Sequence, residues 1–172
     1  MSLSIHDASV PVLARALANL AGVVEKGRVH AESEKVDPAI LLGMRLYPNM
    51  FAFTRQVQVV SDTAKGCVAR LGAVEAPKFA DTESSFEELK QRIDKTLAFV
   101  KGFEPRQLQA AESRAIVLQF PNNTLNFKNG WDYLLTFVLP NVYFHCAMAY
   151  GVLRHGGVKL GKSDYLGSIG GG

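Results

Sequence analysis

The stretch from Gly130 to His155 constrains the fold more than any other part of this chain. Its sequence, GWDYLLTFVLPNVYFHCAMAYGVLRH, is rich in apolar and aromatic residues and contains one internal histidine, His145. Residues three and four apart share a helix face, so His145 lies on one face with apolar residues. These are Val142, Ala149 and Val152. We therefore predict a core helix that carries a histidine inward and that is kinked or divided at Pro140, because proline removes a backbone donor.

Three further segments space their apolar residues as amphipathic helices do, at steps of three and four. They run from Ile5 to about Glu32, from Asn49 to Gly72 and from Ser84 to Phe103. The last of these begins with a capping-box pattern, in which serine is followed three residues later by glutamate. Asp37 followed by proline is a helix-start signal, and it predicts an additional short helix over residues 38–46.

Residues 115–127 predict a β-hairpin. The turn sequence Pro121-Asn122-Asn123 separates one short apolar run from alternating Leu125 and Phe127. An isolated hairpin is only marginally stable, so we expect it to lie against the helices as a lid or flank. We predict that residues 1–172 form a single all-α domain, a helix bundle with a crossover connection, one short extra helix and this hairpin before the last helix.

Composition narrows the classes of function. A net charge of +3, without a run of lysine and arginine, gives no reason to expect a nucleic-acid partner. No uninterrupted apolar stretch reaches about 18 residues, so we expect no membrane partner. The first ten residues do not resemble a signal peptide, and Cys67 and Cys146 both lie in apolar helical patterns that suit buried thiols. We expect a cytoplasmic protein.

One motif match is rejected on its context. GGVKLGKS, from Gly156 to Ser163, fits the phosphate-binding pattern GxxxxGK[ST]. That loop requires a strand before it and a helix after it, so that backbone amides and the helix N-terminus hold the phosphate. Here a helix precedes the motif, and only nine residues follow it. We expect no nucleotide site.

Local spacing does not gather the four histidines into a metal site. His145 has an alanine four residues on, and His155 lies about 15 Å further along a continuous helix. His6 and His30 flank the first helix at opposite ends. Three interpretations of His145 stay open: a buried neutral imidazole with one polar partner, a ligand-contacting or catalytic residue, and a metal ligand completed by Asp62 or a distant histidine.

Other candidate ligand-binding residues lie on two helices. Arg55, Gln58 and Asp62 follow one edge of the second long helix, beside its apolar stripe. Such an edge is either a solvated face or the wall of a cavity. Tyr150 on the last helix joins the candidate set, although an aromatic ring with a polar tip is also typical of packing.

Two segments resemble a known family. They are LYPNMFAFTRQVQVVSDTAKG, from Leu46 to Gly66, and LPNVYFHCAMAYGVLRHGGVKLGKSDYLG, from Leu139 to Gly167. Together they resemble a bacterial and fungal family of uncharacterised proteins in the DinB/YfiT-like superfamily of metalloenzymes. The resemblance implies an up-down-down-up four-helix bundle, often a homodimer.

The resemblance also implies a cofactor. Superfamily members commonly bind a divalent metal, such as zinc or nickel, through one histidine on the second helix and an HxxxH pair on the last. Some members are thiol transferases or hydrolases. In this sequence only His145 matches a ligand, because the segment from Asn49 to Gly72 contains no histidine and position 149 is alanine.

Three hypotheses for function follow. The first is a bundle that binds a small molecule in a central cavity near His145, with enzymatic activity left open. The second is a metal-dependent transferase or hydrolase with a degenerate site, in which Asp62 or another side chain replaces a histidine. The third is a structural or interaction protein whose interior is filled by its own side chains.

Overall fold

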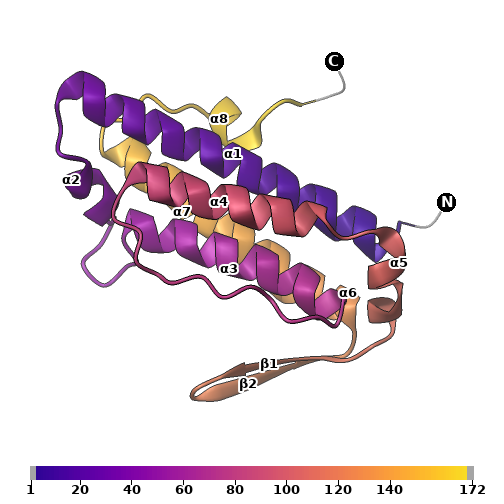
Figure 1. The fold of residues 1–172 in the computed structure, drawn as a ribbon. Helices are drawn as coiled ribbons and strands as arrows, with labels where there is room; N and C mark the ends of the chain where they lie inside the picture. The colour runs from indigo at the N-terminus through magenta and orange to yellow at the C-terminus, as the bar shows by residue number, and fades with distance from the viewer. Residues whose placement is uncertain (1–2, 170–172) are drawn as a thin grey trace.

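Four long helices form a bundle in the computed structural model, which describes residues 3–169 (Figure 1). The four are α1 (Ile5–Glu34), α3 (Phe53–Leu71), α4 (Phe86–Lys101) and α7 (Leu139–His155). Figure 1 shows α1 and α7 running one way and α3 and α4 the other. The main packing pairs are α1 with α4 and α3 with α7. The predicted all-α, up-down-down-up bundle is confirmed.

The crossover lies between α3 and α4. Because these two helices run in the same direction, residues 72–85 must return along the length of the bundle, as Figure 1 shows. Ser85 then starts α4 with the predicted capping box: its hydroxyl accepts from the Glu88 backbone N–H at 3.1 Å, and the Glu88 carboxylate accepts from the Ser85 N–H at 3.2 Å. Two otherwise unpaired backbone donors are thereby satisfied.

The smaller elements also match the local signals. Asp37 caps α2 (Pro38–Gly43), its carboxylate accepting from the Ala39 N–H at 2.9 Å. After α4 come α5 (Pro105–Leu108) and a 3₁₀ turn, η1 (Gln109–Glu112). The helix over residues 38–46 is shorter than predicted, because Met44 already has extended backbone.

The hairpin consists of β1 (Ile116–Phe120) and β2 (Asn123–Phe127), paired antiparallel. Ile116 is buried and joins the core, whereas Val117 is half exposed. The Phe127 ring contacts Tyr133, with ring centroids 5.1 Å apart. The hairpin is therefore a flank of the bundle, beside the end where α5 and α6 lie (Figure 1).

Pro140 divides the last helical region, as predicted. The chain forms α6 (Gly130–Tyr133), then a π-helical turn, η2 (Leu134–Val138), and then α7. In the π turn the Leu139 N–H donates to the Leu134 carbonyl, five residues back. The wider turn accommodates a proline that has no N–H and that crowds the turn before it. The rotation of α7 after this turn determines where His145 points.

Two helical segments are long and apolar enough to cross a membrane by length and composition, Ile5–Glu34 and Gly130–His155. Both contribute a buried face to the core of the bundle, including Leu13 and Leu17 from the first and Val142 and Val152 from the second. Core helices pass the same length and composition test. The expectation of no membrane partner stays a prediction.

Candidate functional site

His145 is buried where α7 packs on α3, and its partner is Gln56. The His145 Nδ1–H donates to the Gln56 side-chain oxygen at 2.6 Å. The Gln56 amide nitrogen donates in turn to the Phe51 carbonyl at 3.0 Å. Because that nitrogen faces a carbonyl, the amide oxygen must face the imidazole. Nδ1 therefore carries the proton, and Nε2 keeps a lone pair.

The environment of His145 Nε2 leaves this lone pair available. No residue within 3–169 forms a hydrogen bond with it, and it is not among the fully buried unpaired atoms of those residues. The Phe51 ring stacks on the imidazole at 6.2 Å, and the Phe144 ring meets it edge-on at 5.1 Å. Both phenylalanines are about half exposed. The imidazole is thus a hydrogen-bond acceptor beside two solvent-accessible aromatic rings.

Electrostatics keep His145 neutral. Burial, and secondarily the positive charge of Arg55, lowers the pKa of the imidazole below its usual value. The Arg55 guanidinium lies 5.8 Å from the centre of the Phe51 ring. A neutral imidazole with a free Nε2 can accept a hydrogen bond, take a proton, or supply one ligand to a metal.

The residues around His145 do not form a metal site. Its partner on α3 is an amide, Gln56, and the residue one turn on along α7 is Ala149, which is fully buried. Within residues 3–169 no group of three or more histidine, cysteine, aspartate or glutamate side chains converges. A zinc or nickel site normally takes at least three protein ligands, so one imidazole and an amide do not fit such an ion.

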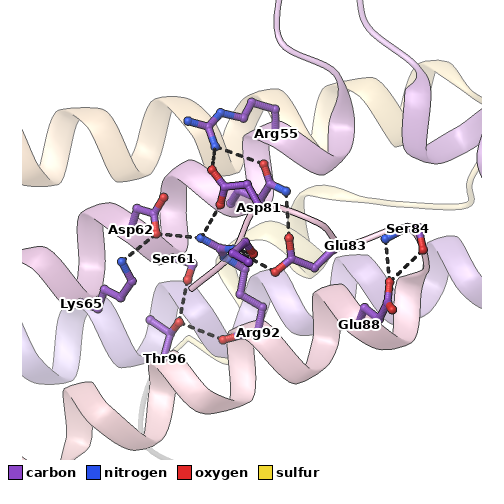
Figure 2. A network of polar contacts seen from close by, with 12 residues as sticks. Arg55, Ser61, Asp62, Lys65, Asp81, Glu83, Ser84, Glu88, Arg92 and Thr96 are labelled. Carbon is purple, nitrogen blue, oxygen red and sulfur yellow. Dashed lines mark hydrogen bonds and ion pairs between the residues drawn. The ribbon is translucent and has the colours of Figure 1, made fainter. Parts of the chain in front are cut away.

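Asp62 does not replace a missing histidine, because it belongs to a separate ionic network centred on Arg92 (Figure 2). Its carboxylate accepts from Arg92 at 2.7 Å and pairs with Lys65 at 2.8 Å. Arg92 also binds Asp81 at 3.0 Å and Glu83 at 2.8 Å. Together these contacts join α3 to α4 and join α4 to the crossover segment.

Arg55 and Gln58 extend the same network. Arg55 forms an ion pair with Asp81 and donates to the Gln58 side-chain oxygen at 3.2 Å. The Gln58 amide donates to Glu83 at 2.8 Å. The three cations Arg55, Lys65 and Arg92 thus pair with three carboxylates, those of Asp62, Asp81 and Glu83 (Figure 2).

The balanced charges indicate that the network has a structural role. Arg92 is almost fully buried and also donates to the Ala80 carbonyl at 3.1 Å, with its guanidinium 5.6 Å from the Phe79 ring centre. Hydrogen bonds from Arg92 and Gln58 outweigh the effect of burial and lower the pKa of Glu83. The network anchors the crossover segment and presents no excess charge to a ligand.

The candidate residues therefore lie in separate parts of the structure. Arg55 lies near both the Phe51 ring and the ionic network, whereas Gln58 and Asp62 belong to the network alone. Tyr150 packs its ring against Tyr165, 6.3 Å away, at the C-terminal segment. Two prominent cavities of the described chain are lined by other residues than His145. That these candidates bind a ligand stays a prediction.

Sequence reasoning missed Gln56 and Phe51. Gln56 lies three residues after Phe53 and four before Val60, two fully buried residues of α3, so helical spacing places it on the apolar face. A polar residue on such a face needs a partner, so this spacing could have marked Gln56 as a candidate. Phe51 carried no signal, because it lies off the apolar stripe of the predicted helix Asn49–Gly72; in the structure that helix, α3, begins later, at Phe53.

The fold and the histidine on the last helix define the class of protein: a DinB-like four-helix bundle. Residues 5–166 match the family described as "Domain of unknown function (DUF1993)", and the chain belongs to this family. It is also similar to a crystal structure of a DinB family member protein from Shewanella denitrificans, at 38% identity and a TM-score of 0.85. That alignment covers 95% of this chain and 92% of the other. The chain matches none of the curated proteins.

Proposed function

We propose that the protein binds a small molecule at the His145 imidazole. The ligand is a flat aromatic molecule that carries an O–H or N–H donor. The donor meets the Nε2 lone pair, and the ring packs against Phe51 and Phe144, which are about half exposed. Aromatic walls around a small number of placed polar groups are typical of small-molecule sites.

The observation that carries this proposal is the hydrogen bond from His145 to Gln56. It fixes the tautomer in which Nε2 carries the lone pair, while burial keeps the ring neutral. Nδ1 is satisfied within the protein, and Nε2 has no partner within residues 3–169. An imidazole held in this way is a pre-organised acceptor, and a ligand gains affinity when its partner is already oriented.

Nuclear magnetic resonance of the histidine side chains tests the proposal. Substituted phenols are titrated into ¹⁵N-labelled protein beside their methyl ethers, which have the same ring without the donor. We expect the phenols to shift the His145 Nε2 signal and the ethers to have a smaller effect. His145→Ala should abolish phenol binding, and His155→Ala, a change of an exposed histidine at the end of α7, should leave it intact. Unchanged phenol binding in His145→Ala would refute the proposal.

We also propose that the protein is a cytoplasmic homodimer. Leu46, Phe51 and Phe144 are large apolar side chains with 41–53% exposure. Phe51 and Phe144 also border the His145 site, so this interface would place the ligand between the two copies; Leu46 approaches α7 at Gly151. An apolar patch of this kind supports association with a second copy. Sedimentation of the wild type and of Phe144→Glu tests this: a dimer that dissociates on substitution supports the proposal, and a monomeric wild type at micromolar concentration overturns it.

A further inference from the structure

A cavity of about 530 Å³ lies between α1, α7 and the C-terminal helix α8 (Lys162–Leu166). It is separate from the His145 site: Tyr143 and Cys146 line it from α7, and His145 does not. The α1 wall is mainly apolar, and α8 adds Tyr165 and Leu166. The apolar residues of the α1 wall are Val12, Ala16, Leu20 and Val23. The volume falls within the range of small-molecule pockets, about 300–1,000 Å³.

The α8 segment crosses the cavity as a strap held by polar contacts. Arg15 donates to the Leu166 and Ser168 carbonyls at 2.8 and 2.9 Å. Asn19 donates to the Tyr165 carbonyl at 3.0 Å. None of the residues of α8 is fully buried. A helix of five residues has little stability of its own, so these contacts from α1 hold it in place over the cavity.

The charge of the cavity is one-sided. Arg15 is the single charged side chain that lines it, and no carboxylate does. The hydrogen bonds of Arg15 go to neutral carbonyl oxygens, and within residues 3–169 it forms no ion pair. An apolar wall with one uncompensated cation at its edge is complementary to a molecule with a hydrocarbon body and one anionic end.

We propose that this cavity binds an apolar monocarboxylate beneath the α8 strap. The hydrocarbon packs along the wall formed by Ala16, Leu20 and Val23, and the carboxylate pairs with Arg15. Tyr143 and Tyr165 cover the ligand on the other sides. Entry requires α8 to move away from α1, which breaks the hydrogen bonds from Arg15 and Asn19 and the Lys26–Asp164 ion pair.

Calorimetric titration tests the proposal with decanoate, below its micelle concentration, and with decanol as the uncharged counterpart. Ala16→Phe fills the cavity, and Ala18→Phe, on the exposed face of the same helix, is the matched control. We expect Ala16→Phe to weaken decanoate binding at least about tenfold and Ala18→Phe to have little effect. Arg15→Gln should weaken decanoate about tenfold more than decanol, because the lost contacts to α8 affect both ligands and the lost charge affects decanoate alone.

A readout on the wild type protects the test against a variant that fails to fold. Decanoate should shift the backbone amide signals of residues 12–23 and of Tyr165, and it should leave the His145 Nε2 signal in place. Absence of decanoate binding, equal affinity of Ala16→Phe, or an equal loss of decanol affinity in Arg15→Gln would each overturn the proposal. Because the probe differs from the phenols used at His145, failure at one site is distinguishable from failure at the other.

Discussion

Replacing Gln56 by leucine should destabilise the protein by about 1 kcal/mol. The change removes the acceptor of the His145 Nδ1–H in a site where His145 is 8% exposed. A buried donor without a partner costs about 1–3 kcal/mol. The buried leucine offsets about 1 kcal/mol of this through its apolar surface. The Phe51 carbonyl also loses a donor, but Phe51 is half exposed and water can replace it.

The assay is urea unfolding at pH 7.5. The pKa of His145 is lowered from 6.5 by burial and by Arg55, so at this pH the imidazole is neutral in both the folded and the unfolded state. Titration of His145 therefore does not contribute to the difference in stability between the wild type and Gln56→Leu. Gln91→Leu, an exposed change on α4, is the control and should alter stability by less than about 0.5 kcal/mol.

The ¹⁵N shifts of the imidazole provide a second readout. In the wild type we expect His145 to be protonated at Nδ1 alone, and in Gln56→Leu both tautomers should be populated. If the variant unfolds at the same urea concentration as the wild type and keeps the same tautomer, the Gln56 contact neither orients the ring nor stabilises the fold. The proposal for ligand binding at Nε2 would then lose its basis.

A substitution by histidine at position 56 tests why the metal pattern of the superfamily does not fit here. Gln56 faces His145 from α3, and Ala149 lies one turn along α7. Gln56→His with Ala149→His therefore supplies one histidine on the second long helix and an HxxxH pair on the last. We expect the double variant, but not Gln56→His alone, to bind about one equivalent of zinc by elemental analysis and to melt higher with zinc. Stoichiometric metal in the untagged wild type would contradict this account.

Two further predictions concern the bundle itself. Gly27→Ala should cost about 1 kcal/mol of unfolding free energy, because its Cβ would lie 2.7 Å from Phe86, whereas Gly22→Ala, with open space around it, should gain up to about 1 kcal/mol through helix propensity. Arg92→Met should cost about 2 kcal/mol at pH 7. Because the pKa of Glu83 is lowered in the folded state, its contribution is present above pH 4.5 and is lost on acidification; this loss should shrink in Arg92→Met. Denaturant titrations from pH 3 to 7 check both, and equal acid sensitivity of the two proteins would refute the second.

Local patterns were enough to predict most of the elements. Apolar spacing predicted the four long helices, and the Ser85 and Asp37 signals located two helix starts, because a cap depends on residues within one turn. Pro121 and the asparagines after it marked the hairpin turn. Pro140 predicted a break in the last helix, and the structure shows that the break is a π turn.

The contacts that define the candidate sites were decided only by the tertiary structure. Gln56 and His145 are 89 positions apart, and Arg92 meets Asp62 across 30 positions. Helical periodicity indicates which face of a helix is buried, but the rotation and axial shift between two helices depend on how all their side chains interlock. The sequence alone therefore determined the helices, their caps and the inward face that carries His145. Which side chain His145 meets, and that α8 covers a cavity on α1, depend on packing between segments far apart in the chain.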